Sequence, residues 1–392
     1  MPAEIRNSIL KELERELAEL EEKFQRRSLQ RLAGVNLCSN DYLGLSENPE
    51  LREFVAEAVR RAGKIGGTGS RLLSGQHAAW DEMEEEFAAF AGTEAALYFG
   101  SGYAANLGLL TSLLGKTDLV FSDALNHASI IDGIRLSGAR KMVYRHGDLN
   151  ELEAALRRHD SERCRKIVVT ETVFSMDGDV ADVRAIVELA ERFGASVIVD
   201  EAHATAVHGP EGRGIVAETG NTERVLAALH TCGKALASAG AFVCGSGVLR
   251  EHLINRARTF IFSTAMPPYM AEQIGAALRL ARRMESERRE LLRAAREFAA
   301  ELRRDGWDTS ATNSQIVPAV VGGNEEALGA AESLRSEGFA VRAIRPPTVE
   351  EGRARLRLSL TSKIGRNELV RLRAMLSAWR ARTEVHTAAG RA

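Results

Sequence analysis

Short apolar runs alternate with longer amphipathic stretches between about residues 50 and 275. The runs are typical of buried strands, and the stretches between them have the three-to-four spacing of helices. Because helical crossovers join parallel strands, this alternation predicts one mainly parallel seven-stranded sheet with helices on both faces. The predicted strands cover residues 95–99, 119–123, 141–145, 166–171, 196–201, 224–230 and 241–246.

The pattern changes after about residue 275. A long charged helix is predicted over 282–304, and short strands with helices between them follow at 315–321, 340–344 and 355–360. This order indicates a smaller α+β domain. The expected organisation is an N-terminal helix and arm over 1–45, a large domain over 46–275, a small domain over 276–382 and a disordered tail over 383–392.

The N-terminal stretch has an amphipathic pattern of its own. Its apolar residues recur every three or four positions among Glu, Lys and Arg: Ile5, Ile9, Leu13, Leu17, Leu20 and Phe24. This spacing predicts a helix with one apolar face. We expect that face to pack on the body of the protein or on a partner subunit.

Composition narrows the classes of ligand. The 392 residues are 45% hydrophobic and 27% charged, which is typical of a globular protein of about two domains. A net charge of -2 gives no reason to expect nucleic acid or a membrane surface as partner, and neither a spanning run nor a signal peptide is evident. The four cysteines fall singly, so neither a disulfide framework nor a metal site is predicted. A small-molecule ligand and a cytoplasmic setting are the resulting expectations.

Two motifs permit more than one interpretation. The segment 100–105, Gly-Ser-Gly-Tyr-Ala-Ala, follows a predicted strand and opens a predicted helix, so the backbone amides beside Gly102 form an anion site for a phosphate. A dinucleotide fold remains open here, because Asp123 could hold a ribose. The segment 199–203, Val-Asp-Glu-Ala-His, resembles the magnesium-binding strand of a helicase, but no GxxxxGK[ST] loop accompanies it.

Chemically useful side chains gather where predicted strands end. Ser175, Asp200, His203 and Lys234 occupy such positions, and His127 comes shortly after the second strand. The carboxyl ends of parallel strands share one edge of the sheet, so these groups are expected to converge there. Pyridoxal phosphate (PLP) chemistry needs such a set: a lysine for the Schiff base, a carboxylate for the pyridine nitrogen and a phosphate site.

Five segments together resemble a known family, and the resemblance extends from residue 36 to residue 361. They are 36–44 (NLCSNDYLG), 122–129 (SDALNHAS), 173–178 (VFSMDG), 199–203 (VDEAH) and 231–234 (TCGK). The chain is identified by them as a member of the α-oxoamine synthases, which are fold-type-I PLP-dependent transferases. The resemblance implies an acyltransferase that joins an amino acid to an acyl thioester with loss of carbon dioxide. It also implies a homodimer with active sites at the subunit interface.

The resemblance assigns a role to individual residues. It makes Lys234 the Schiff-base lysine, His127 the residue stacked on the cofactor ring and a substrate contact, and Asp200 the partner of the pyridine nitrogen. His203 and Ser175 match positions near the phenolic oxygen. The remaining matches are Gly102, Tyr103 and Thr231 for the phosphate, Thr264 for the phosphate of the neighbouring subunit, and Asn40 and Arg357 for the substrate carboxylate.

Two regions discriminate between substrates: the C-terminal stretch with 343–348 (AIRPPT) followed by 353–361 (RARLRLSLT), and residues 262–268 (FSTAMPP). Both resemble the family member that condenses L-alanine with a pimeloyl thioester, carried by CoA or a carrier protein, in biotin biosynthesis. Thr348 is then a substrate contact, and either Arg26 or Arg27 binds the acyl group. Residues 122–136 are equally similar to glycine C-acetyltransferase, so that activity stays open. A binding protein that kept this fold without turnover is a further alternative, although the whole catalytic set is present.

Overall fold

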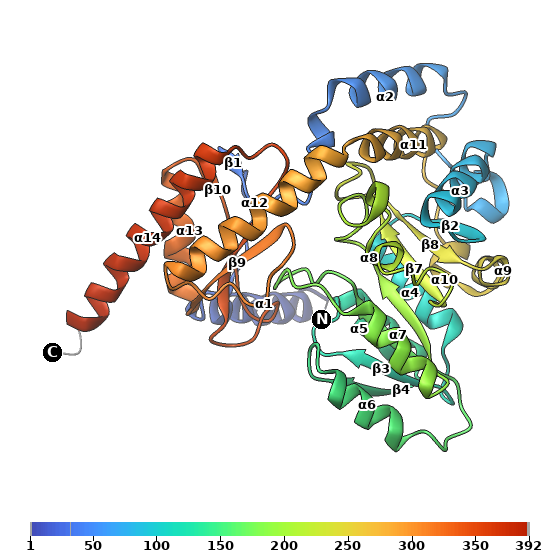
Figure 1. Ribbon diagram of the computed structural model, residues 1–392, viewed down its shortest axis with the longest axis horizontal. Coiled ribbons are helices and arrows are strands. Elements are labelled where there is room, and N and C mark those ends of the chain that lie inside the picture. Colours follow the sequence, from blue (N-terminus) through green and yellow to red (C-terminus); the bar gives the residue numbers. More distant parts are fainter. Residues whose placement is uncertain (1, 32, 390–392) are drawn as a thin grey trace.

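The computed structural model describes residues 2–31 and 33–389. Figure 1 shows a larger part built on one sheet and a smaller C-terminal part beside it. The large sheet has seven strands in the order β2-β8-β7-β6-β5-β3-β4. Strands β3 to β7 are parallel to one another, and β8 is antiparallel to both of its neighbours. The predicted mainly parallel seven-stranded sheet is confirmed.

The strands lie close to their predicted positions, because each is a short apolar run bounded by polar or turn residues. Three have the predicted bounds and the other four differ by one to three residues at an end. They are β2 (Ala95–Phe99), β3 (Leu119–Asp123), β4 (Arg140–Tyr144), β5 (Lys166–Glu171), β6 (Ser196–Asp200), β7 (Ala227–Thr231) and β8 (Ala241–Gly245).

Both faces of this sheet are covered, as the apolar runs predicted. Along β6, Val197 and Val199 belong to one buried cluster and Ile198 to another, because successive side chains point to opposite faces. Helices α4 (Gly102–Leu113) and α5 (Ala128–Ser137) pack in the Ile198 cluster. The other helices of this part are α2 (Pro49–Arg61), α3 (Ala78–Ala91), α6 (Leu149–Arg158), α7 (Val183–Arg192), α8 (Ile215–Glu218), α9 (Gly247–Arg256), α10 (Arg258–Ile261) and α11 (Pro268–Arg283).

The C-terminal part is an antiparallel sheet covered by helices. Its three strands follow the order β11-β12-β9, and a separate parallel pair joins β1 to β10. The helix predicted from residue 282 begins at Glu285, because α11 runs to Arg283 and Met284 leaves helical geometry. The single strand predicted over 340–344 is two short strands. The elements are α12 (Glu285–Arg304), β9 (Ile316–Gly322), α13 (Asn324–Ser336), β1 (Val35–Asn36), β10 (Phe339–Ala340), β11 (Ala343–Ile344), β12 (Ala354–Ser359) and α14 (Arg366–Ala389).

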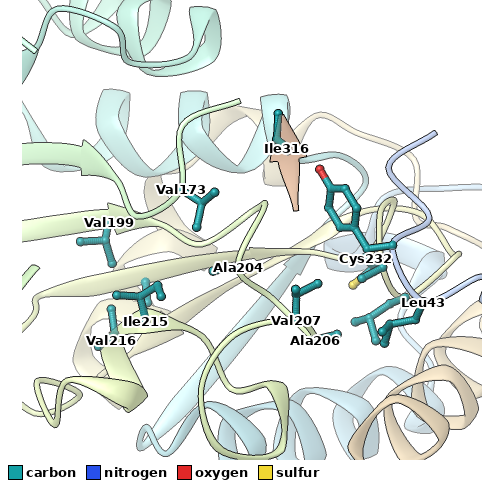
Figure 2. Packing of buried hydrophobic residues seen from close by; sticks show 14 of the residues in the cluster. Leu43, Val173, Val199, Ala204, Ala206, Val207, Ile215, Val216, Cys232 and Ile316 are labelled. Carbon is teal, nitrogen blue, oxygen red and sulfur yellow. The ribbon is translucent and has the colours of Figure 1, made fainter. Parts of the chain in front are cut away.

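The two parts share one core where the N-terminal arm meets them. Figure 2 shows Leu43 of the arm, Val207 of the loop after β6 and Ile316 of β9 in one group of buried side chains. Gln315, which is fully buried, donates to the backbone carbonyl of His203 and contacts the His208 ring. The loop that carries His203 is therefore fixed from both parts of the molecule.

Both ends of the chain are helical. Helix α1 (Pro2–Glu22) confirms the predicted N-terminal helix, but its apolar side chains stay exposed within the chain: Ile9, Leu13 and Leu17 are 54%, 47% and 45% exposed. Helix α14 continues to Ala389, so residues 383–389 are helical and not a tail without regular structure. Residues 390–392 of that predicted tail lie outside the described residues. No described helix is long and apolar enough to cross a membrane.

A steric test of the junction between the two parts uses Gly178 and Gly194. Both have left-handed backbone angles, but a Cβ on Gly178 would collide with the Ile316 carbonyl group, whereas nothing lies near Gly194. Gly194→Ala should lower the free energy of unfolding by about 1 kcal/mol, the cost of the backbone conformation. Gly178→Ala should lower it by about 3 kcal/mol or more, because overpacking is added. The free energy of unfolding is measured by denaturant titration. An equal decrease in the two variants would contradict the steric conflict at Gly178.

Candidate active site

Lys234 lies at the carboxyl edge of the large sheet, in the turn after β7. Its Nζ is 2.8 Å from Nε2 of His203, and Nδ1 of His203 is 2.6 Å from the hydroxyl of Tyr42. Tyr42 comes from the N-terminal arm and His203 from the loop after β6, so three distant segments meet here. The result is a continuous hydrogen-bonded chain from the lysine to the arm.

Burial affects the protonation states of Lys234 and His203 in this hydrogen-bonded chain. Burial lowers the pKa of Lys234 to about 8, although Asp200 and Glu171 oppose the shift, and nearby Arg357 adds to it. Burial and then the Lys234 charge hold the pKa of His203 well below its ordinary value. A neutral His203 has one N–H, and its two ring nitrogens face the Lys234 amine and the Tyr42 hydroxyl. The edge thus holds an amine that gives up its proton close to neutral pH.

Asp200 ends β6 and is held firmly on the same edge. Its Oδ1 accepts from the backbone N–H of Ala202 at 2.8 Å, and its Oδ2 accepts from Asn106 of α4 at 2.8 Å. The Asn106 amide also reaches the hydroxyl of Ser129 in α5 at 2.9 Å. Because both carboxylate oxygens are oriented, Asp200 is a fixed acceptor for an N–H group such as a protonated pyridine.

The start of α4 forms a close cradle beside this carboxylate. A Cβ on Gly102 would lie 2.8 Å from Cγ2 of Thr231, so only glycine lets the helix and β7 approach this closely. Ser101 caps the helix, and Tyr103 is 43% exposed and donates to Asp132. A helix N-terminus with free amides and adjacent hydroxyls fits a phosphate group. Gly102 and Thr231 therefore lie against each other, and Tyr103 follows Gly102 in the first turn of α4.

His127 lies at the start of α5, between the Tyr103 and Asp200 regions. Its Nδ1 is 2.8 Å from the Ser129 hydroxyl and also caps the helix by accepting from the Ser129 backbone N–H. Burial, and to a lesser extent Lys234, lowers its pKa, while Asp200 opposes the shift. The Tyr103 ring meets it edge to face at 6.4 Å. A neutral imidazole held in this way offers an aromatic face to a planar ligand.

Arg357 of β12 brings the small sheet to the site. Its guanidinium donates to the Asn40 side chain at 3.0 Å, to the Ser359 hydroxyl at 2.6 Å and to the backbone carbonyl of Ser175. It is 8% exposed, and no acidic side chain pairs with it among the described residues. A buried guanidinium without a carboxylate partner is suited to bind a substrate carboxylate.

Two further predicted contacts have other neighbours. Thr264 forms an isolated antiparallel bridge with Ser70, in the glycine-rich segment 66–71 (GGTGSR). Thr348 lies beside Arg27, whose Nη2 is 3.5 Å from the Thr348 hydroxyl and 3.4 Å from the Pro346 carbonyl oxygen. Arg26 instead pairs with Glu21 at 3.0 Å. The structure thus separates the two N-terminal arginines that the sequence left equivalent.

Three residues of the site were not singled out from the sequence. They are Tyr42, Asn106 and Glu171, each buried at the sheet edge. Asn106 had a detectable signal, because it is a polar residue one turn after Gly102 between the apolar Ala105 and Leu107. Tyr42 had no signal in the sequence except its place in the segment 36–44, and Glu171 had none except its place at the end of the predicted strand 166–171. Only the fold shows which residues lie beside them.

Comparisons with known proteins agree on one family. Residues 33–373 match the aminotransferase class I and II family. A putative 8-amino-7-oxononanoate synthase of Geobacillus kaustophilus is 44% identical over 91% of this chain and 95% of its own length. The 8-amino-7-oxononanoate synthase of Geobacter sulfurreducens is 45% identical over 91% of this chain and 94% of its own.

A solved structure extends the agreement to the fold. Serine palmitoyltransferase from S. paucimobilis, determined with a bound PLP–myriocin aldimine, is 28% identical and superposes with a TM-score of 0.88 over 96% of this chain and 99% of its own. This likeness confirms the predicted fold-type-I class. The chain belongs to the aminotransferase class I and II family, in the group that contains the 8-amino-7-oxononanoate synthases.

Proposed function

We propose that this protein is a PLP-dependent acyltransferase that condenses L-alanine with a pimeloyl thioester. The products are 8-amino-7-oxononanoate, carbon dioxide and the free thiol of CoA or of a carrier protein, and the reaction serves biotin synthesis. The observation that carries this proposal is the half-buried Lys234, hydrogen-bonded to His203 on the sheet edge that also holds Asp200. The high identity to named 8-amino-7-oxononanoate synthases supports alanine and pimeloyl substrates over glycine and acetyl-CoA.

Each part of the site would hold one part of the cofactor. Lys234 is the point of covalent attachment, and Asp200 accepts from the ring nitrogen. His127 lies against the ring, and Ser175 and His203 serve the phenolic oxygen. The phosphate is bound by Gly102, Tyr103 and Thr231, with Thr264 contributed by a neighbouring subunit.

The residues around Lys234 perform the proton transfers. PLP, when bound, supplies a protonated ring that accepts the electron pair left at Cα of alanine. Lys234 Nζ removes the Cα proton, and its pKa of about 8 lets the amine act as a base close to neutral pH. Arg357 and Asn40 bind the alanine carboxylate and orient the Cα–H bond. His203, kept neutral by burial, hydrogen-bonds Lys234 and holds its amine in place.

We further propose a cytoplasmic homodimer. Large apolar side chains that the chain leaves exposed support a partner subunit: Leu73 is 84%, Val248 81% and Phe262 71% exposed. Phe262 lies two residues from Thr264, which is the residue proposed to reach the other active site. Four free cysteines support a reducing compartment. A carrier protein is a possible donor of the pimeloyl group, next to CoA.

The attachment of the cofactor is tested through its absorption spectrum. Wild-type protein should show the absorption band of lysine-bound PLP, and borohydride should fix the cofactor to Lys234. Lys234→Ala should lose the band and at least about a thousandfold in kcat, because it removes both the attachment point and the base. Lys141→Ala changes an exposed lysine on edge strand β4 and is the matched control. A Lys234→Ala spectrum like that of wild type would refute the proposal.

The choice of substrates is tested by product detection. L-alanine with pimeloyl-CoA should give 8-amino-7-oxononanoate, whereas glycine with acetyl-CoA should give product at least about a hundredfold more slowly, since specificity is set by kcat/KM. The measurement is mass-spectrometric quantification of both products under the same conditions. Turnover of the second pair alone would assign the protein to the glycine C-acetyltransferases.

The binding of the distal end of the acyl chain is tested by replacing each of two neighbouring arginines. We propose that Arg27, beside Thr348, binds the distal carboxylate of the pimeloyl chain. Arg27→Ala should raise the KM for pimeloyl-CoA roughly tenfold or more, because a charge-assisted hydrogen bond is lost. Arg26→Ala should change it less than about threefold, since Arg26 pairs with Glu21. With an acyl-CoA that lacks the distal carboxylate, both variants should have the KM of wild type. A raised KM of Arg27→Ala for this substrate would show that Arg27 does not act on the distal carboxylate.

A further inference from the structure

Glu171 ends strand β5 beside Asp200, and none of the roles above uses it. Glu171 and Asp200 are Cα partners on neighbouring parallel strands. Their side chains point to the same face, because Ile167 and Val169 of β5 lie in the same buried cluster as Ile198 of β6. Two carboxyl groups therefore lie side by side at the edge that carries Lys234.

The surroundings of the two carboxyl groups differ. Asp200 accepts hydrogen bonds from Ala202 and Asn106 on its two oxygens. Glu171 is 2% exposed, and its Oε1 has no hydrogen-bond partner among the described residues. No cation in the described part of the chain forms an ion pair with it, and the Nζ of Lys234 contacts His203 instead. A negative charge on Glu171 would therefore be buried without an ion-pair partner and with one oxygen left without a hydrogen bond.

The groups that face Glu171 reinforce this difference. Asp200 on β6 and Asp123 on β3 are like charges, and Lys234 after β7 and the backbone N–H of His127 oppose them. Burial, followed by the Asp200 charge, raises the pKa of Glu171 well above its ordinary value. Two adjacent buried carboxyl groups cannot both ionise without a large cost, so one of them keeps its proton. The hydrogen bonds place the negative charge on Asp200.

We propose that Glu171 is a neutral carboxylic acid that limits the Glu171–Asp200 pair to one negative charge. This inference rests on the proposed PLP function, in which Asp200 holds the proton on the ring nitrogen. Glu171 acts through Asp200, so it is a positioning residue. Its neutrality also matters for Lys234, because a second charged carboxylate would hold the amine in its protonated form.

The first test measures PLP affinity. Glu171→Gln replaces a neutral acid by a neutral amide of the same shape, so the Kd for PLP at pH 7 should change by less than about threefold. Asp200→Asn removes the charge that faces the ring nitrogen and should weaken binding at least about tenfold. A tenfold loss in Glu171→Gln as well would show that Glu171 is a charged partner of the cofactor and would overturn the proposal.

The second test follows the thermal unfolding of the full-length apoprotein with pH. A carboxyl group whose pKa is raised on folding contributes most below its unfolded pKa of about 4.3, and its contribution is lost as pH rises through the folded pKa. The unfolding temperature of wild type should therefore fall relative to that of Glu171→Gln between pH 5 and pH 8. A difference that stays constant over this range would overturn the proposal. Glu171→Met provides a second non-ionisable variant if Glu171→Gln does not fold.

Glu201→Gln is the matched control for removing a buried carboxyl group near Asp200. Glu201 points to the opposite face, where it accepts from the backbone N–H groups of Ile215 and Val216. Its replacement should destabilise the fold and change the pH dependence of unfolding, because burial raises the pKa of Glu201 to about 7. The control is therefore read on the cofactor absorption band, whose pH dependence should change less in Glu201→Gln than in Glu171→Gln. A wild-type protein that does not bind PLP would refute the proposed function and leave the unfolding test of Glu171 valid. Normal PLP binding with identical pH profiles in wild type and Glu171→Gln would refute the inference alone.

Discussion

The partial burial of Lys234 at the carboxyl edge of the sheet is the constraint on which the rest of the site depends. An amine removed from water loses much of its preference for the charged form, and the pKa of Lys234 falls to about 8 as a result. The surrounding groups must then leave the amine free to exchange its proton. A neutral His203 at 2.8 Å and a carboxylate that is near but not ion-paired meet that requirement. The charge state of each neighbour follows from the burial that they share.

The small sheet completes the half of the site that faces the substrate. Arg357 reaches the Ser175 carbonyl, and Arg355 pairs with Asp177 of the same loop at 2.6 Å. Gln315, the residue before β9, donates to the backbone of the loop that carries His203. Strands β9 and β12 therefore position residues of the large part as well as supplying Arg357. Residues that serve the cofactor and residues that serve the substrate are held by the same contacts.

The N-terminal arm is attached by hydrogen bonds to its backbone. The Arg345 guanidinium donates to the carbonyl oxygens of Phe24 and Arg26, and Asn324 donates to that of Lys23 at 3.0 Å. These contacts fix the turn after α1 and direct the next side chain, Arg27, toward Thr348. The apolar side chains of α1 from Ile9 to Leu20 take no part in them and stay exposed within the chain.

The sequence by itself determined the elements and most of the chemistry. Apolar runs located the seven strands of the large sheet within a few residues, because a strand that is buried on both faces is a short continuous apolar run, which is a local property of the sequence. Strand ends, together with the resemblance of five segments, marked Lys234, Asp200, His203 and His127. The break at Met284 and the helical residues 383–389 were missed, because helix boundaries depend weakly on local pattern.

Only the tertiary structure decided which side chains meet. It brought Tyr42 to His203, Asn106 to Asp200 and Glu171 to Asp200, and it separated Arg27 from Arg26. The residues of the first three pairs lie far apart in the chain. Arg26 and Arg27 are adjacent, and they differ only in the direction of their side chains. A local pattern fixes the face on which a residue lies but not the neighbour that it finds there, because strand order and domain packing set that neighbour.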